Sequence, residues 1–329
     1  MQIHYQEVIR QLDRAGAEHR PCFFLLDYER TEGVFVSEPL AKATAQDGLC
    51  WTIGAWQVDS SAPRALVPQL QAVHPEAEEE YARRFGCIYQ GLQRGDSFLA
   101  NLTLRTPIEL NTTSLADIYA HTKAKYKVLL PGRFVCYSPE TFVRIRGNRI
   151  ATYPMKGTID ASLEDAAERL LSDYKEHCEH CTIVDLMRND LSRVAEHVRV
   201  ARFKYLDRLT TSRGDILQMS SEVVGELEPD WHRRLGTLLD SLLPAGSISG
   251  APKERTCQLI GAAEGISRGY YTGICGYYDG ECLDTGVLIR FIEENEGRYY
   301  YRSGGGITIN SQMSEEYQEC IQKVYLPIG

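Results

Sequence analysis

The sequence lacks the apolar runs that would place the chain in or across a membrane. No uninterrupted apolar stretch approaches the ~18 residues that a spanning helix requires. The opening residues, MQIHYQEVIRQLDRAG, also lack the basic region and the following apolar run of a secretory signal. We therefore predict a cytoplasmic protein.

An excess of positive charge is also missing. Asp and Glu outnumber Lys and Arg by 45 to 36, which gives a formal net charge of -9 at pH 7. Proteins whose main partner is nucleic acid or an anionic membrane usually present a basic surface, so both classes are disfavoured. An acidic protein that binds an anionic substrate must gather its cations locally.

No regular cysteine spacing is present. The ten cysteines are scattered, and most stand next to apolar residues, as is typical of reduced thiols that pack as small apolar side chains. We predict that all ten are free. The segment HCEHC at 177–181 offers zinc-ligand types, but consecutive helix residues point in different directions and cannot converge on one ion. Core packing is therefore expected for its two cysteines.

The chain is interpreted as a short N-terminal segment, residues 1–77, that packs on a catalytic domain, residues 78–329. Residues 22–26 form an apolar run that predicts a buried strand. Residues 59–78 contain three prolines and no sustained pattern, so they are interpreted as a connection.

The periodicity of apolar residues predicts helices and strands in both halves of the catalytic domain. Tyr81, Phe85, Ile88 and Leu92 favour a helix over 78–93, and Ser162 is a good N-cap for a helix through 181. The other predicted elements are a strand at 97–105, a hairpin at 135–153 around a turn at 147–148, a loop at 244–252, β-rich runs at 272–278, 285–292 and 298–301, a loop at 304–306, and a helix from about 312.

Lys156, in the run YPMKGT, ends a predicted strand and leads into a loop. A lysine there is most often a solvated charge. The alternative is a nucleophile, but with a reference pKa near ~10.4 only about one amine in two thousand is neutral at pH 7. A reactive Lys156 therefore needs desolvation or a neighbouring cation.

Acidic and glycine-rich segments near the C-terminus have two readings each. Glu315, Glu316 and Glu319 would usually form a solvated acidic face of a helix. The alternative interpretation is that a hard cation such as Mg²⁺ draws one or two of these carboxylates inward. The loop at 244–253 lacks the spacing of a phosphate loop, although its N–H groups, like those of 304–306, suit another anion.

Eight motifs in order resemble the chorismate-utilising enzymes, a family that contains anthranilate, isochorismate, salicylate and aminodeoxychorismate synthases. The likeness runs from about residue 78 to 323. The motifs are SPE, PMKGT, EHCTIVDLMRND, PAGSISGAPK, YYTGICGYYDG, LDTGVLIR, GGGI and EYQECIQK. The resemblance implies an α+β fold of layered antiparallel β-sheets flanked by helices.

The residue before Gly157 and Thr158 separates the branches of this family. Anthranilate and isochorismate synthases resemble one another in having alanine at this position. A lysine there resembles the branch of the family that aminates chorismate to 4-amino-4-deoxychorismate, for 4-aminobenzoate and folate synthesis. The resemblance makes Lys156 a covalent nucleophile and Glu140 of SPE the acid that protonates the departing hydroxyl. An isochorismate or anthranilate synthase is the alternative enzyme, and a weakly active chorismate-binding subunit is the alternative outside catalysis.

The resemblance also implies a cofactor and substrate contacts. Glu179 and Glu319 match the carboxylates that hold Mg²⁺. The substrate's charges and ring would be met by Gly157, Thr158, Tyr271, Arg290, Gly304, Gly305, Gly306 and Lys323. An unpaired buried guanidinium would be costly, which favours an anionic ligand for Arg290.

Two departures from the family pattern are visible. Gln218 stands where many relatives carry histidine, so a neutral amide replaces a possible acid or base. No match to the tryptophan-site motif of longer relatives is found, so feedback by tryptophan is not predicted. The sequence ends at Gly329 without a glutaminase or lyase domain, so we expect ammonia from a separate glutamine amidotransferase and a separate lyase.

Overall fold

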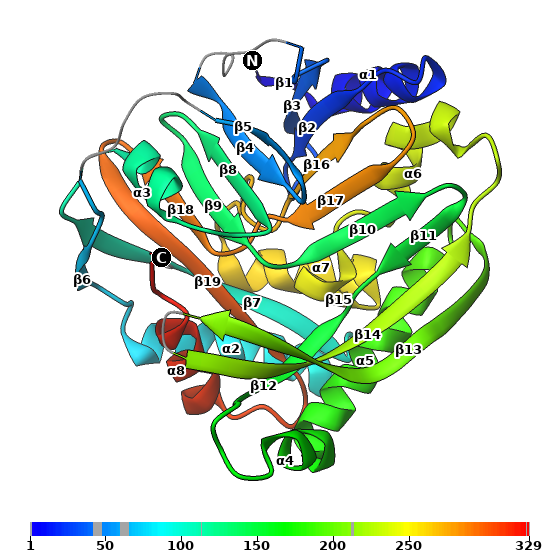
Figure 1. The fold of residues 1–329 in the computed structure, drawn as a ribbon. Coiled ribbons are helices and arrows are strands. Elements are labelled where there is room, and N and C mark those ends of the chain that lie inside the picture. Colours follow the sequence, from blue (N-terminus) through cyan, green and yellow to red (C-terminus); the bar gives the residue numbers. More distant parts are fainter. Residues whose placement is uncertain are drawn as a thin grey trace.

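Two antiparallel β-sheets lie face to face between outer helices in the computed structural model of the chain (Figure 1). The structure describes residues 2–41, 48–59, 66–112, 114–211, 214–326 and 328. This architecture confirms the predicted α+β class. Within the described residues, no helix is both long and apolar enough to span a bilayer.

The first sheet has ten strands within these residues, in the order β1-β3-β2-β16-β17-β10-β11-β14-β12, with β13 also paired to β14. Its strands are β1 (Gln2–His4), β2 (Cys22–Leu26), β3 (Glu32–Ser37), β10 (Thr141–Arg146), β11 (Arg149–Thr152), β12 (Met155–Asp160), β13 (Glu196–Thr211), β14 (Gly214–Glu226), β16 (Ile274–Tyr278) and β17 (Leu283–Val287).

The second sheet has nine strands within the same residues, in the order β15-β7-β19-β18-β9-β8-β4-β5, with β6 paired to β7. Its strands are β4 (Cys50–Ile53), β5 (Trp56–Val58), β6 (Leu70–Val73), β7 (Leu99–Leu110), β8 (Tyr126–Leu130), β9 (Phe134–Ser138), β15 (Gly250–Ala251), β18 (Phe291–Asn295) and β19 (Arg298–Ile307).

Helices cover the outer faces of both sheets. They are α1 (Tyr5–Ala17), α2 (Glu78–Gln93), α3 (Leu115–His121), α4 (Ala166–Ser172), α5 (Tyr174–Leu191), α6 (Leu235–Leu242), α7 (Lys253–Glu264) and α8 (Met313–Gln322), with two 3-10 turns, η2 (Trp231–Arg234) and η3 (Gly246–Ile248). The predicted helix over 78–93 and the terminal helix are confirmed.

The alternation of side chains along β2 explains why every residue of this strand is buried. Phe24 and Leu26 pack toward α1 and α6, whereas Phe23 and Leu25 pack toward the second sheet. Successive strand residues point to opposite faces, so a strand in a middle layer must be apolar on both.

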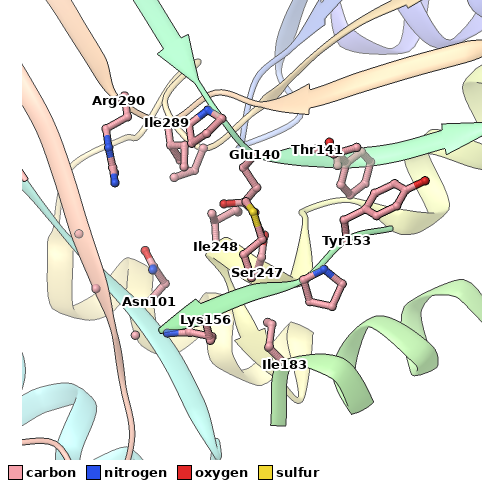
Figure 2. Close-up of a pocket in the computed structure, with 18 of the residues that line it drawn as sticks. Asn101, Glu140, Thr141, Tyr153, Lys156, Ile183, Ser247, Ile248, Ile289 and Arg290 are labelled. Carbon is pink, nitrogen blue, oxygen red and sulfur yellow. The ribbon is translucent and has the colours of Figure 1, made fainter. Parts of the chain in front are cut away.

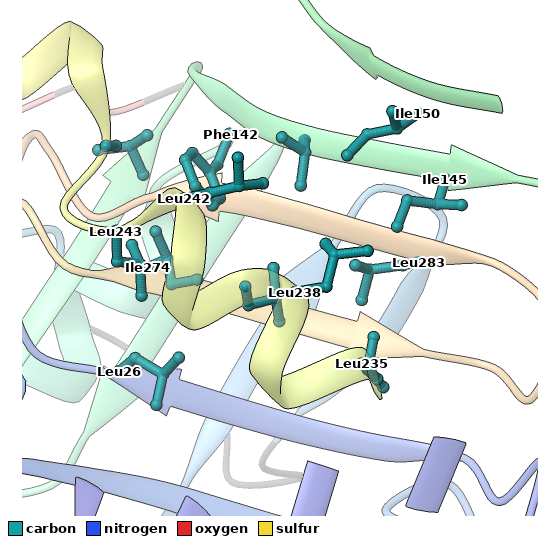
Figure 3. Close-up of a cluster of buried hydrophobic side chains, with 14 of the residues drawn as sticks. Leu26, Phe142, Ile145, Ile150, Leu235, Leu238, Leu242, Leu243, Ile274 and Leu283 are labelled. Atoms are coloured by element: carbon teal, nitrogen blue, oxygen red, sulfur yellow. The ribbon is translucent and has the colours of Figure 1, made fainter. Parts of the chain in front are cut away.

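Figure 3 shows the outer core of the first sheet, where Leu235, Leu238 and Leu242 of α6 lie against Phe142 and other side chains of the sheet. These leucines recur at three- and four-residue steps, so they form one apolar stripe on the helix. Helices α2, α7 and α8 cover the outer face of β7 and β19 in a separate apolar cluster. The sheets are therefore held from both sides.

Two of the short connections that cross from one sheet to the other correct the predicted strands. Residues 135–146 are not one arm of a hairpin, because β9 ends at Ser138 in the second sheet and β10 begins at Thr141 in the first. Residues 285–292 are likewise split, because β17 and β18 belong to different sheets. Of the hairpin predicted at 135–153, only the part formed by β10 and β11, around 147–148, is confirmed.

Three further predictions at the helices and the glycine run were wrong. Ser162 does not cap a helix, because its N–H and hydroxyl bind Asp160, and Asp173 caps α5 through a bond from the Glu176 N–H. The glycines at 304–306 are strand residues of β19 that pair with β7, not a loop. All ten cysteines are free as predicted, but Cys178 and Cys181 are half-buried and do not pack in the core.

The N-terminal residues supply strands to both sheets. β1 to β3 join the first sheet through the pairing of β2 with β16, and β4 joins the second sheet through β8. Of the predicted connection at 59–78, residues 60–65 lie outside the described part, and residues 70–73 form β6. The domain division at residue 77 stays a prediction.

Candidate active site

A cavity of about 290 Å³ lies where the two crossing connections meet. The connections are joined by hydrogen bonds from the Tyr137 N–H to the Arg290 carbonyl, at 3.1 Å, and from the Val287 N–H to the Glu140 carbonyl, also at 3.1 Å. The cavity brings together every predicted site residue except Glu179: Glu140, Lys156, Gly157, Thr158, Tyr271, Arg290, Gly304, Gly305, Gly306, Glu319 and Lys323. Glu179 reaches it through Lys156.

Glu140 projects into the middle of the cavity toward Ser247 of η3 (Figure 2). The Ser247 hydroxyl donates a hydrogen bond to Glu140 Oε1. Burial raises the pKa of Glu140 above its ordinary value, although this hydroxyl and the charges of Arg290, Lys156 and Lys323 act in the opposite direction. A carboxyl in this setting can carry a proton that it then donates.

Lys156 owes its direction to a β-bulge. Met155 pairs with Ser220 and Thr158 with Gln218, so β12 has one residue more than β14 over this interval. Gly157 stands in the bulge with φ of +76°, a conformation that favours glycine. A bulge turns a side chain out of the regular ladder, and Figure 2 shows Lys156 in the cavity beside Asn101.

The Lys156 ammonium lies 3.1 Å from Glu179 Oε2 on α5. Burial lowers the pKa of Lys156, but the carboxylates of Glu179, Glu319 and Glu176 outweigh it, so the pKa is raised above the ordinary value. The Lys156 amine is therefore desolvated, as a nucleophile requires. Its charged neighbours are anions, however, whereas a neighbouring cation would be needed to lower its pKa.

Four carboxylates form an acidic cluster beside Lys156: Glu176, Glu179, Glu316 and Glu319. Each pair stands three residues apart on one helix, which places both members on the same face of α5 or of α8. The carboxylates of α8 lie directly against Gly305 of β19. A methyl group added at Gly305 would lie 3.3 Å from Glu316 Oε2 and 3.6 Å from Glu319 Oε1. Mutual repulsion adds to burial in raising the pKa of Glu176 and Glu316.

This cluster suits a hard divalent cation. Mg²⁺ binds through one or two protein carboxylates and keeps water or substrate oxygens as its other ligands, so Glu179 and Glu319 suffice as protein ligands. Glu316 is buried, at 3% exposure, and Lys175 approaches it only to 4.0 Å. Such an incompletely neutralised buried carboxylate favours a cation nearby.

Two cations, Arg290 and Lys323, make another part of the cavity wall positive. Arg290 stands between β17 and β18, not within a strand as predicted, and its guanidinium donates to the Tyr325 hydroxyl at 3.4 Å. Among the described residues, no carboxylate lies within ion-pair distance of Arg290. Lys323, which directly follows α8, binds Glu319 Oε1 at 2.6 Å and the Gly304 carbonyl at 2.8 Å. An anionic ligand would supply the partner that Arg290 lacks.

The glycine run of β19 adds backbone donors. Gly304 and Gly306 pair with Thr103 and Asn101 of β7, whose N–H groups bind Glu264 and Ser249 instead. These are therefore the non-hydrogen-bonded pairs of the ladder, and the N–H groups of Gly304 and Gly306 point away from β7. The partner on that side, β18, begins only at Phe291 opposite Arg302, so the edge beside the glycines is open to a ligand.

Sequence reasoning did not find several residues of the cavity. Asn101 and Ser247 line it but belong to segments that were interpreted as an ordinary strand and a loop. Glu176, which belongs to the neighbouring acidic cluster and not to the cavity lining, was also missed, although its spacing from Glu179 places both on one face of α5. Gln218, noted as a departure, does line the cavity, on β14 opposite Thr158.

Arg268 binds the backbone of two cavity-lining segments, and its removal is expected to destabilise the protein. Its guanidinium binds Glu264 at 2.6 and 2.9 Å and donates to the carbonyls of Ile248 and Asn101. Arg268→Met would leave Glu264 buried without its cation, so we expect the free energy of unfolding to fall by about 3 to 5 kcal/mol. Urea denaturation measures this loss.

Arg255→Met is the matched control, because Arg255 lies on α7 like Glu264 and its ion pair with Asp96 is solvent-exposed. That pair is expected to contribute less than about 1 kcal/mol. Equal losses in the two variants would contradict a special role for the buried pair.

Comparisons with known proteins agree with this geometry. The family model described as chorismate binding enzyme matches residues 22–328. An uncharacterized PabA-like protein of Pasteurella multocida is 50% identical over 323 residues, which cover 98% of each chain. Aminodeoxychorismate synthase component 1 of Bacillus subtilis is 30% identical over 265 residues, covering 76% of this chain and 55% of the relative.

A solved structure is also similar. Anthranilate synthase component I of Streptococcus pneumoniae superposes with a TM-score of 0.65 at 29% identity, covering 77% of this chain and 58% of that chain.

Proposed function

The chain belongs to the family of chorismate binding enzymes, and we propose that it is the subunit of an aminodeoxychorismate synthase that aminates chorismate. The reaction replaces the C4 hydroxyl by an amino group and keeps the enolpyruvyl side chain, so no pyruvate is released. The product, 4-amino-4-deoxychorismate, leads to 4-aminobenzoate and folate.

The observation that carries this proposal is the position of a lysine amine and a carboxyl of raised pKa on the walls of one small cavity. Lys156 comes from the bulge in β12, and Glu140 comes from the connection between β9 and β10. An isochorismate or anthranilate synthase would not require a lysine nucleophile at this position. Overall identity does not separate the two branches, since an anthranilate synthase component 1 is 39% identical and an aminodeoxychorismate synthase component 1 is 30% identical, so the assignment rests on Lys156.

The proposed chemistry divides a difficult displacement into two steps. The Lys156 amine forms a bond to ring C2, the two ring double bonds shift, and the C4 hydroxyl leaves as water after protonation by Glu140. Ammonia then adds at C4, the double bonds shift back, and the C2–N bond to Lys156 breaks. The lysine is regenerated, and chorismate plus ammonia gives the aminated product plus water.

Binding of the dianionic substrate would use the cationic wall and the open glycine edge. Arg290 offers a bidentate fork to one carboxylate, and the N–H groups of Gly304 and Gly306 offer further donors. Lys323, Tyr271, Gly157 and Thr158 complete the proposed contacts. Mg²⁺ held by Glu179 and Glu319 would neutralise the charge of the ring carboxylate when bound.

Glu319→Gln is expected to raise the Mg²⁺ concentration for half-maximal activity by about tenfold or more, because one anionic ligand is lost. Glu179→Gln should act in the same direction. Glu315→Gln is the matched control, since Glu315 lies on the same helix with its side chain 57% exposed. Titration of activity with Mg²⁺ measures the change, and an equal shift in Glu315→Gln would argue against the assignment.

Ammonia is proposed to come from a separate glutamine amidotransferase subunit, and 4-aminobenzoate would be made by a separate lyase. The relative named PabA-like matches this chain over 98% of both lengths, and its name is compatible with a glutamine amidotransferase partner. Free ammonium should replace the glutaminase in the assay.

The test is product analysis by liquid chromatography with mass detection, on purified protein with chorismate, Mg²⁺ and ammonium at mildly alkaline pH. The expected product carries an amine in place of a hydroxyl, without release of pyruvate. Isochorismate or anthranilate would show that Lys156 does not select the amination branch. Unchanged chorismate, with ammonium and with a glutaminase partner, would favour a binding subunit in which Gln218 marks the loss of activity.

A further inference from the structure

A second group of ligand-type side chains lies far from the cavity, at the opposite end of β16 and β17. The cavity adjoins Tyr271 and Arg290, which precede β16 and follow β17, whereas the turn that joins these two strands is at the other end. There Glu281 of the turn meets His19, which follows α1, and His232 of η2. One nitrogen of each imidazole and a carboxylate oxygen lie within 4.8 Å of one another.

We propose that His19, His232 and Glu281 bind a transition-metal dication, with Zn²⁺ as the preferred ion. Two imidazoles and one carboxylate are a ligand set that suits zinc, with water in the fourth position. The site is independent of the proposed amination, and its metal would join three segments that are distant in the sequence.

Hydrogen bonds fix both imidazoles in the form that can bind a metal. His19 Nδ1 lies 2.8 Å from the Gly280 carbonyl, which only accepts, so Nδ1 carries the proton. The Tyr278 hydroxyl donates its proton to the same carbonyl at 2.6 Å and therefore accepts from His232 Nδ1 at 2.7 Å. Both Nε2 atoms are left with a free lone pair.

This pattern is the outer shell expected around metal-binding histidines. A histidine ligand generally donates its second N–H to a carbonyl, hydroxyl or carboxylate, which fixes the ring orientation. Here a single carbonyl, that of Gly280, receives His19 directly and His232 through Tyr278. Simple stacking of two surface histidines would not require these acceptors.

The backbone around the group is shaped for close approach. A methyl group at Gly280, whose φ is +107°, would lie 2.7 Å from the His19 carbonyl oxygen, so only glycine lets the turn come this near. Asp279 accepts hydrogen bonds from the N–H groups of Glu281 and Cys282, which orders the turn. His19 itself has φ of +50°, a region in which most side chains are disfavoured.

Only side-chain movement is needed to complete the coordination. With bonds of ~2.0–2.1 Å, tetrahedral zinc ligands lie ~3.3–3.5 Å apart, so ligand atoms that now lie within 4.8 Å of one another must close by up to ~1.5 Å. The Glu281 side chain is 79% exposed and that of His19 is 52% exposed, so both can turn. Glu281 Oε1 now lies 3.6 Å from His19 Nδ1, so its side chain must turn toward Nε2.

The test uses untagged, chelator-stripped protein titrated with Zn²⁺ by calorimetry in excess Mg²⁺, which occupies the acidic cluster. One Zn²⁺ per chain should bind and raise the midpoint of thermal unfolding. His19→Ala and Glu281→Gln should each weaken binding by about tenfold or more. His74→Ala and Glu109→Gln are the controls, because this exposed pair, 2.9 Å apart, has no second histidine and should leave binding unchanged.

Two results would overturn the proposal. One is the absence of Zn²⁺ binding, or affinities that are equal in the wild type, His19→Ala and Glu281→Gln. The other is a thiolate band in the Co²⁺ spectrum that disappears in Cys181→Ser, which would assign the metal to His177 and Cys181, 3.6 Å apart on α5. Binding that persists in Cys181→Ser and is lost in His19→Ala would support the site.

Discussion

Replacing Lys156 with alanine is expected to reduce the amination of chorismate by about 10³-fold or more, because the proposed covalent route loses its nucleophile. The rate of product formation is measured by liquid chromatography with saturating Mg²⁺ and ammonium. Chorismate binding should weaken much less, since Arg290 and the open edge of β19 are unchanged.

The physical reason lies in what surrounds the amine. In the ligand-free protein, burial favours the neutral amine, but Glu179, Glu319 and Glu176 keep the pKa of Lys156 above its ordinary value. The amine therefore begins as an ammonium paired with Glu179 and must lose its proton before it attacks. A charge on the lysine alone cannot perform this role, because bond formation to C2 requires the lone pair.

Two variants separate nucleophilicity from charge. Lys156→Arg keeps a cation beside Glu179 but offers no neutral amine, and should be as inactive as Lys156→Ala. Lys175→Ala removes a cation that lies 3.8 Å from Glu315 and 4.0 Å from Glu316, outside the cavity lining, and should stay near wild-type activity. An unchanged kcat in Lys156→Ala would refute the covalent route.

The same variant series can trap the intermediate. Intact protein mixed with chorismate and Mg²⁺, without ammonia, should gain the mass of chorismate less one water. Lys156→Ala should show no gain, and Lys175→Ala should show the full gain. A mass gain that persists in Lys156→Ala would place the adduct on another residue.

The fold was predictable where apolar periodicity was long and unbroken. Tyr81, Phe85, Ile88 and Leu92 give the helix α2 its correct bounds, because one stripe faces one core. The corners between the sheets were not predictable from the same rule. Arg290 lies between β-formers, so its run resembles a single strand although the chain changes sheets within it. At Glu140 the preceding Pro139 does interrupt the run, and the predicted hairpin passed over it.

The candidate site shows a similar division. The family motifs predicted most of the residues that the cavity brings together. Those residues lie at strand ends, at the connections between the sheets or on helix faces that border the cavity. Long-range pairing set the rest. Asn101 lines the cavity because β7 pairs with the glycines of β19. Glu316 and Glu319 reach the site because α8 folds over Gly305, and neither placement has a local signal.

Replacing Glu140 with glutamine is expected to lower the amination rate by about 10²–10⁴-fold, the usual contribution of a general acid. The amide occupies the same space and can still accept the hydrogen bond from Ser247, but it has no proton to give to the departing hydroxyl. The Michaelis constant for chorismate should change little. An activity near wild type would exclude Glu140 as the acid.

The pH dependence of the same step has a definite sign. Burial raises the pKa of Glu140 against the opposing effect of the Ser247 hydroxyl and of nearby cations. The acid form exists below that raised pKa, so at constant free ammonia the rate should fall as pH rises through it. Ser247→Ala removes a donor that favours the charged carboxylate, so the pKa should rise further and the alkaline limb should move to higher pH. A rate that instead rises with pH through the pKa of Glu140, in the wild type and in Ser247→Ala, would mean that the carboxylate, and not the acid, is the active form of Glu140.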